Sequence, residues 1–234
     1  MIEPLPILLV PGLLASPRLY APQLPMLWRF GPVMVADTTR GTSIAEIARG
    51  ILAAAPPRFA LIGLSMGGYI AFEIQRQAPD RVLRLGLLDT SARPDPPEAS
   101  ALRRQQKEQV GHGGFAAVLD AFYPRVVHPS RLGDAALRQI FDQMAADLGP
   151  EVFIRQQGAI IARADSRPGL AAIRCPTLVA VGDSDALTPP ELADEIAAAI
   201  PGARRATIGD CGHISTLEQP EAVNAILEDW LRAG

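Results

Sequence analysis

The stretch that decides the fold reads Gly63-Leu64-Ser65-Met66-Gly67-Gly68. It matches the pattern G-x-S-x-G, and it lies between an apolar run at residues 59–62 and a helix-like segment that ends at Ala78, before Pro79. A sharp strand-to-helix turn of this kind strains the serine, and small residues two positions before and after it avoid backbone clashes. The hydroxyl of Ser65 would project from the top of a sheet beside a helix N-terminus, which favours developing negative charge. Ser65 is therefore a candidate nucleophile, and the alternative is a simple helix N-cap.

Apolar runs and amphipathic segments alternate on both sides of this turn. The apolar runs predict strands at residues 7–10, 33–36, 59–62, 82–88, 177–181 and 204–208. The amphipathic segments predict helices at residues 43–55, 66–78, 190–200 and 218–231. Ser43 and Glu46 form a predicted capping box, and Thr188 is a candidate cap for the helix at 190–200. The alternation favours an α/β fold with a mostly parallel central sheet of about six strands and helices on both faces.

One long segment interrupts this alternation. From about Arg93 to Pro168 the pattern is helical, with predicted parts at 98–110, 114–122, 134–147 and 151–163. An insertion between two sheet strands must lie outside the sheet layer. Because ligands bind at the carboxyl ends of parallel strands, we expect 93–168 to form an inserted helical cap over those ends. Residues 1–92 and 169–234 would form the core beneath this cap. The alternative for 93–168 is a separate small helical domain.

A serine needs a general base to become a good nucleophile. His213 directly follows the predicted strand 204–208, so it would lie at the same end of the sheet as Ser65. His112 and His128 fall within the predicted cap, where surface or loop positions explain them. His213 is therefore the candidate base.

The imidazole in turn needs a carboxylate that fixes its tautomer. Asp89, Asp183 and Asp185 each follow a predicted strand. The order Ser65, Asp185, His213 is the chain order of one known type of triad, which favours Asp185. Asp183 would instead order its turn, and Asp89 remains an alternative acid.

Four stretches of the sequence resemble the α/β-hydrolase fold family, in its short, capped, bacterial esterase-like branch. They are Leu9-Val10-Pro11-Gly12-Leu13, Gly63 to Gly68, Gly182-Asp-Ser-Asp-Ala-Leu-Thr-Pro189 and Gly212-His213. The resemblance covers nearly the whole chain outside the predicted cap. In that family the acid lies in a G-x-x-D-x-x-x-P stretch, which maps onto Asp185. The region from Thr188 to Pro220 is similar to esterases and enol-lactonases.

The resemblance implies an oxyanion hole of two backbone N–H groups. One belongs to Met66, the residue after the nucleophile, and the other to Leu13, in the loop after the first strand. The family often has histidine where this chain has Pro11. Against the family pattern, we expect the leading hairpin to be missing or shortened. The resemblance implies no metal and no organic cofactor.

Apolar side chains near these motifs and in the predicted cap are candidates for a substrate pocket. They are Leu14, Phe115, Leu119, Phe122, Tyr123, Phe141 and Met144. Each of those in the cap could equally belong to the cap's own core. No cationic cluster adjoins the motifs, although Arg93, Arg155 and Arg163 could reach a charged substrate. We therefore expect a small, uncharged and fairly apolar ester as the substrate.

These residues together predict a serine hydrolase that works through an acyl-enzyme. Rival chemistries on the same residues are lactone, thioester or carbon–carbon bond hydrolysis, and perhydrolysis. A second rival is a non-enzymatic ligand receptor on this fold. A nucleotide-binding protein is disfavoured, because neither G-x-G-x-x-G nor a P-loop is present.

Composition agrees with a protein that binds small molecules. The 234 residues carry a net charge of −3, which offers neither the basic face of a nucleic-acid protein nor a polybasic membrane patch. No apolar run reaches the roughly 18 residues of a spanning helix, and the N-terminus does not read as a signal peptide, so a cytoplasmic protein is expected. Cys175 and Cys211 match neither a disulfide framework nor a zinc motif. The oligomeric state is not predicted.

Overall fold

The computed structural model describes residues 4–233. The first three residues and the last residue of the predicted core 1–92 and 169–234 lie outside the described residues. Six strands form one sheet, in the order β2-β1-β3-β4-β5-β6, and each neighbouring pair is parallel. The strands are β1 (Ile7–Val10), β2 (Val33–Val35), β3 (Phe59–Leu64), β4 (Val82–Leu88), β5 (Thr177–Gly182) and β6 (Arg204–Ile208). The predicted α/β fold with a six-stranded sheet is confirmed, and the described sheet is parallel throughout.

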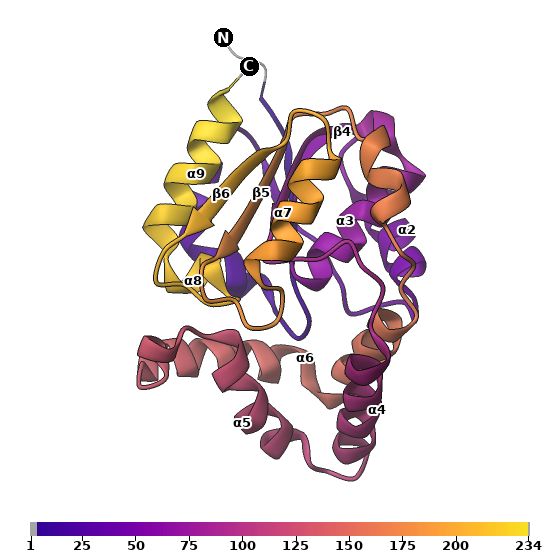
Figure 1. Ribbon diagram of the computed structural model, residues 1–234, viewed down its shortest axis with the longest axis vertical. Coiled ribbons are helices and arrows are strands. Elements are labelled where there is room, and N and C mark those ends of the chain that lie inside the picture. The colour runs from indigo at the N-terminus through magenta and orange to yellow at the C-terminus, as the bar shows by residue number, and fades with distance from the viewer. Residues whose placement is uncertain (1–3, 234) are drawn as a thin grey trace.

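Helices cover both faces of the sheet (Figure 1). Successive side chains of a strand point to opposite faces. Ile7 and Leu9 accordingly pack in one apolar cluster with Trp230 of α9 (Pro220–Arg232). Leu8 and Val10 pack in a second cluster with helices α2 (Ile44–Ala54), α3 (Met66–Gln77) and α7 (Pro190–Ala199). The two clusters explain why the inner strands β1, β3 and β5 are buried at every residue.

The four helices predicted outside the long insertion correspond to α2 (Ile44–Ala54), α3 (Met66–Gln77), α7 (Pro190–Ala199) and α9 (Pro220–Arg232). The structure also has short helices that were not predicted there, η1 (Pro17–Gln23), α1 (Leu24–Leu27), η2 (Pro79–Arg81), η4 (Arg167–Ala172) and α8 (Ser215–Glu218). Ser43 caps α2 as predicted, by accepting the N–H of Glu46 at 3.2 Å. Thr188 does not cap α7, because its hydroxyl is bonded to Asp185 and Pro189 occupies the cap position. The predicted helix at 218–231 is divided, and α9 begins only at Pro220.

Between β4 and β5 the chain forms α4 (Pro97–Gly111), α5 (Phe115–Val126), η3 (Pro129–Arg131) and α6 (Ala135–Ile161). We call α4, α5 and α6 the helical layer. It lies beyond the carboxyl ends of the strands, at the bottom of Figure 1. The two helices predicted at 134–147 and 151–163 join into α6, which is interrupted at Gly149, where φ is 79°. Within residues 4–233, no helix is both long enough and apolar enough to cross a bilayer.

The chain leaves the sheet for the helical layer and returns beside its point of departure. The N–H of Ser166 donates to the carbonyl oxygen of Ala92 at 2.9 Å. Arg163 forms an ion pair of 2.6 Å with Asp95 and donates to the carbonyl oxygen of Arg93 at 3.1 Å. The segment that leaves the sheet and the segment that returns to it are therefore joined by backbone and side-chain hydrogen bonds and by one ion pair.

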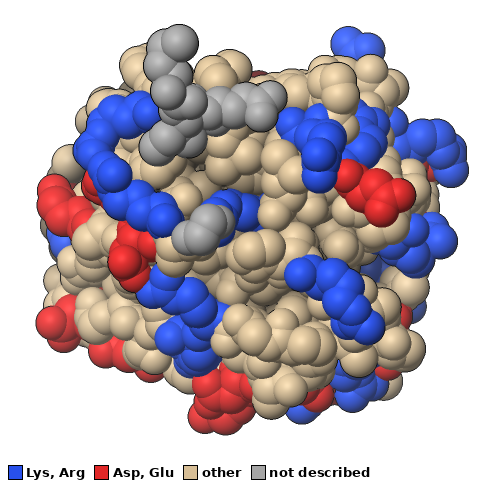
Figure 2. All heavy atoms as spheres, turned by 90° about the horizontal axis from the view of Figure 1, so that it is seen from above, with Lys and Arg blue, Asp and Glu red and all other residues tan. Residues whose placement is uncertain are grey.

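The opposite end of the molecule is shown in Figure 2. Cationic and anionic side chains are interspersed among uncharged residues on this face. Several charged side chains of the molecule form ion pairs, for example Arg29 with Glu228 at 2.5 Å and Arg93 with Glu195 at 2.9 Å. Exposed pairs of this kind contribute little to stability.

Candidate active site

Ser65 lies at the turn between β3 and α3, in the strained conformation that its motif predicts. Its φ is 57° and its ψ is −116°, a region that residues other than glycine rarely occupy. A Cβ atom at Gly67 would lie 1.9 Å from the carbonyl oxygen of Val10, and one at Gly63 would lie 2.3 Å from the carbonyl oxygen of Gly67. The glycines are therefore required by the close approach of backbone to backbone around Ser65.

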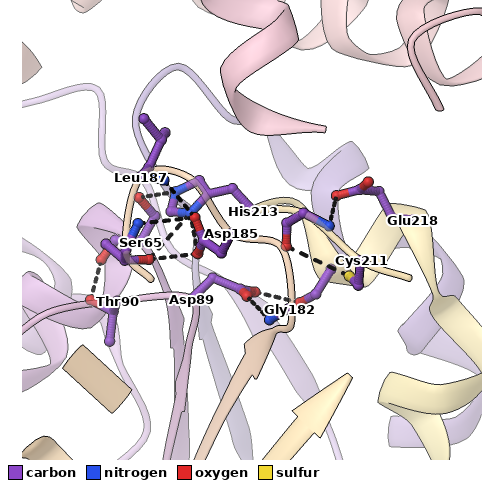
Figure 3. A network of polar contacts seen from close by, with 12 residues as sticks. Ser65, Asp89, Thr90, Gly182, Asp185, Leu187, Cys211, His213 and Glu218 are labelled. Carbon is purple, nitrogen blue, oxygen red and sulfur yellow. Dashed lines mark hydrogen bonds and ion pairs between the residues drawn. The ribbon is translucent and has the colours of Figure 1, made fainter. Parts of the chain in front are cut away.

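Three loops at the carboxyl ends of β3, β5 and β6 bring Ser65, Asp185 and His213 together (Figure 3). The hydroxyl of Ser65 lies 2.8 Å from Nε2 of His213, and Nδ1 of His213 lies 2.8 Å from Oδ2 of Asp185. A carboxylate can only accept, so Nδ1–H donates to Asp185 and leaves Nε2 free to accept the proton of the hydroxyl. Asp185 and His213 are buried, whereas Ser65 is partly exposed.

The carboxylate of Asp185 has further donors. Its Oδ1 accepts the backbone N–H groups of Leu187 at 2.8 Å and Thr188 at 2.9 Å, and its Oδ2 accepts the hydroxyl of Thr188 at 2.6 Å. Burial raises the pKa of Asp185, but the charge of His213 and these hydrogen bonds outweigh it and hold that pKa below its usual value. Burial lowers the pKa of His213, but the charge and hydrogen bond of Asp185 raise it above the usual value overall.

Neither of the other two candidate acids is hydrogen-bonded to His213 within residues 4–233. Asp183 accepts the N–H groups of Asp210 at 3.0 Å and Cys211 at 3.1 Å, so it orders its turn as expected. Asp89 is fully buried and accepts the N–H of Gly182 at 2.9 Å. Burial and the charge of Asp185 raise the pKa of Asp89 to about 8.

Two residues that the sequence reasoning missed hold the loops around this group. The buried Glu218 accepts the N–H of Gly212 at 3.0 Å and that of His128 at 2.6 Å, which joins the His213 loop to the segment after α5. Burial raises the pKa of Glu218. The buried Gln156 of α6 accepts the N–H of Leu14 at 2.8 Å and donates to the carbonyl oxygen of Thr38 at 3.1 Å.

The two residues expected to supply an oxyanion hole both lie next to Ser65. Met66 is the first residue of α3, so its N–H is one of those that a helix leaves without an intrahelical acceptor. Leu13 lies in the loop after β1 and lines the space beside Ser65 and His213. Leu14, the next residue, has a φ of 55°, and its bond to Gln156 holds this loop in that conformation.

Two cavities meet at Ser65. The larger, which we call the polar cavity, has a volume of about 120 Å³, and the smaller, the apolar cavity, about 30 Å³. Both linings include Leu13, Ser65, Phe122 and His213. The polar cavity adds, among others, Arg103, Gln106, Arg125 and Thr188, and the apolar cavity adds, among others, Leu14, Phe141 and Met144.

The predicted pocket residues divide between these cavities and the helical layer's own core. Leu14, Phe122 and Phe141 line the apolar cavity. Phe115 instead packs edge-on against Phe153, with ring centroids 6.0 Å apart, and Tyr123 packs against Phe141 at 5.2 Å. The spacing of aromatic residues along α5 does not distinguish these two roles.

The arginines near the site are not those that the sequence reasoning considered. Arg93 and Arg163 are bound to Glu195 and Asp95, and Arg155 donates to a backbone oxygen. Arg103 and Arg125 line the polar cavity instead. The sequence did not single out Arg103 and Arg125, because both lie on helices far along the chain from the motifs.

Over residues 4–233, no three side chains of His, Cys, Asp or Glu are grouped so that they could hold a metal ion.

Comparison with known proteins agrees with the fold. A model described as the alpha/beta hydrolase family matches residues 5–226. The chain belongs to the α/β-hydrolase family. It is 31% identical over 204 residues to the pimeloyl-[acyl-carrier protein] methyl ester esterase of Aromatoleum aromaticum, and the match covers 82% of each chain.

Solved structures of this family superpose closely on the chain. A malate-bound thermophilic esterase from Thermogutta terrifontis has a TM-score of 0.89 at 33% identity, covering 97% of this chain and 89% of its own. The enol-lactonase from Burkholderia xenovorans LB400 has a TM-score of 0.89 at 27% identity, covering 98% and 92%.

Proposed function

We propose that this protein is a serine hydrolase that cleaves a small carboxylic ester through an acyl-enzyme. The observation that supports it most is the continuous pair of 2.8 Å hydrogen bonds that links Ser65 to His213 and His213 to Asp185. A hydroxyl in contact with a base, which is in turn oriented by a carboxylate, is the geometry of an activated nucleophile.

In the first half of the reaction, the Oγ of Ser65 attacks the ester carbonyl carbon while its proton passes to Nε2 of His213. The C–O bond of the ester then breaks, and His213 returns the proton to the leaving alcohol. Asp185 keeps His213 in the required tautomer and stabilises its charged form.

In the second half, His213 takes a proton from water, the resulting hydroxide attacks the acyl-enzyme, and the acid departs as Ser65 regains its proton. The N–H groups of Met66 and Leu13 would hold the oxyanion in both halves. One such donor contributes about 3–4 kcal/mol to stabilisation of the transition state. The chemistry needs no metal or organic cofactor.

The relatives support ester hydrolysis as the reaction type. One is named as a methyl ester esterase and another as an esterase, while a third is an enol-lactonase. A lactone is a cyclic ester, so lactone hydrolysis is the second candidate function on the same residues. The small volume of the apolar cavity favours an ester with one short side.

Labelling and turnover together test this proposal. A fluorophosphonate should label the folded protein, and Ser65→Ala should abolish labelling and lower kcat on short p-nitrophenyl esters by roughly 10³-fold or more. Ser184→Ala, at an exposed serine, is the matched control and should behave as the wild type. Failure of the wild type to be labelled or to turn over any ester, with ligand binding unchanged in Ser65→Ala, would instead indicate a receptor.

A further inference from the structure

The two cavities beside Ser65 differ in chemistry as well as in size. The apolar cavity has room for about two water-sized groups, and the residues that it adds to the shared lining include Leu14, Phe141 and Met144. The polar cavity is about four times larger in volume and opens between α4, α5 and the Asp185 loop. Because both cavities include Ser65 and His213, an ester held at Ser65 would place one side in each.

The polar cavity carries an excess of positive charge. Among the described residues that line it, the charged side chains other than His213 are Arg103 and Arg125, and both are cationic. Arg125 is exposed and has no ion-pair or hydrogen-bond partner within residues 4–233. The amide of Gln106 lies in the same lining and can donate to an anion.

The charge of Arg103 is only partly compensated. Its Nε lies 3.2 Å from Asp95, and its Nη1 donates to Gln157 at 2.7 Å. The same carboxylate is bound by Arg163 at 2.6 Å, so one buried Asp95 faces two guanidinium groups. The two guanidinium groups and the single carboxylate together carry a net positive charge. Nη2 of Arg103 has no partner among the described residues.

We propose that Arg103 and Arg125 select an ester whose longer side carries a carboxylate, while the other side of the ester bond holds about two non-hydrogen atoms. This inference rests on the hydrolytic function proposed above. A planar guanidinium with free N–H groups binds a carboxylate through charge-assisted hydrogen bonds, which are stronger than those to a neutral amide. The two arginines are therefore specificity residues for the anionic end of the substrate.

Matched pairs of esters test the inference in both orientations. Monomethyl adipate and its terminal carboxamide place the small group on the alcohol side, whereas 4-acetoxybutyrate and its carboxamide place it on the acyl side. We expect kcat/KM for the carboxylate to exceed that for the carboxamide by roughly tenfold or more in one of the two series. This ratio should fall as NaCl is raised, because salt screens exposed charges.

Two variants and one control connect this ratio to the arginines. Arg125→Gln and the double variant Arg103→Gln/Arg125→Gln should bring the ratio towards one, chiefly through a higher KM for the carboxylate. Arg125 is exposed, so its single variant gives an answer even if removal of Arg103 from Asp95 impairs folding. Arg104→Gln removes the same charge from an exposed position on α4 and should keep the wild-type ratio.

The outcomes separate this inference from the proposed function. A ratio near or below one in both series, or a ratio unchanged in Arg125→Gln and the double variant, overturns the inference alone. The same holds if the enzyme hydrolyses neutral p-nitrophenyl esters but neither carboxylate ester. If the protein hydrolyses no ester and is not labelled by a fluorophosphonate, the proposed function fails with it.

Discussion

The carboxylate of Asp89 accepts a 2.9 Å hydrogen bond from the backbone N–H of Gly182, and this bond joins the end of β4 to the end of β5. The other oxygen of Asp89 is bonded to the hydroxyl of Ser215, at the start of α8. Three chain segments are thus held together beneath Asp185 and His213 by one buried carboxyl group. Because both oxygens of Asp89 are used in these two bonds, Asp89 lies near the site while His213 is hydrogen-bonded to Asp185.

We expect Asp89→Asn to change how stability depends on pH. The pKa of Asp89 is about 8 in the folded protein against a usual value of 3.8, so the folded state holds this proton more tightly than the unfolded chain. The free energy of unfolding therefore decreases as the pH rises from about 4 to about 8. An asparagine does not titrate, and its amide can make both hydrogen bonds, so the variant should lose less stability over this range.

Urea unfolding at several pH values between 5 and 8 measures this difference. Asp183→Asn is the matched control, because the pKa of Asp183 lies below its usual value and titrates outside this range. Equal slopes in the wild type and Asp89→Asn would contradict the prediction.

We expect Asp185→Asn to lower kcat by roughly 10³–10⁴-fold, because the amide favours the wrong tautomer of His213. The pH profile should change as well. His213 must be neutral to accept a proton, and its raised pKa moves the rise of kcat/KM to a pH above the usual imidazole value of 6.5.

In the variant, the loss of the negative charge should move that rise to lower pH. Steady-state kinetics between pH 5 and 9 measure both effects on one neutral ester. A profile whose midpoint stays in place in Asp185→Asn would show that another group sets the pKa of His213.

We expect Gln156→Met to lower kcat by about tenfold with little change in KM, as removal of one partner from a buried polar pair costs about 1–3 kcal/mol. The N–H of Leu14 would lose its acceptor, and the loop that carries Leu13 would lose its bond to α6. Gln105→Met, at an exposed position on α4, is the control. An unchanged kcat in Gln156→Met, with the variant folded by circular dichroism, argues against a positioning role.

We expect Gly67→Ala to destabilise the protein strongly, because its methyl group would overlap the carbonyl oxygen of Val10. Gly50→Ala is the matched control on the exposed side of α2, where an added Cβ atom meets no atom within 4 Å. It should stabilise by about 0.5–1 kcal/mol, since alanine is the better helix former. Thermal unfolding of the two variants measures these opposite effects, and similar losses in both would refute the packing argument.

Much of the fold could be predicted because its signals are local. A buried parallel strand is a short apolar run, and the glycines around Ser65 report a backbone contact directly in the sequence. His213 and Asp185 could be placed at the same end of the sheet because each follows a strand. Thr188 was harder to interpret, since a residue before a helix has the composition of a cap whether or not its hydroxyl is used elsewhere.

The rest depends on how helices pack, which spacing along the chain does not reveal. Arg103 and Arg125 reach the polar cavity only because α4 and α5 meet above Ser65. Phe115 and Phe122 are two helical turns apart on α5, and only the second reaches the site. Gln156 lies on a helix that the pattern predicted, but its partners Leu14 and Thr38 are more than a hundred residues away.

The paired crossings at Ala92 and Ser166 make the helical layer a cassette. Its two ends are joined by a 2.9 Å backbone bond, and it supplies Arg103, Phe122 and Arg125, whereas Ser65, Asp185 and His213 come from the sheet. A chimaera that carries the corresponding segment of a homologous esterase between these two points should therefore keep its chemistry and acquire the donor's selectivity. Gene duplication followed by exchange of the segment between Ala92 and Ser166 would therefore be a short evolutionary route to enzymes of this fold with new substrates.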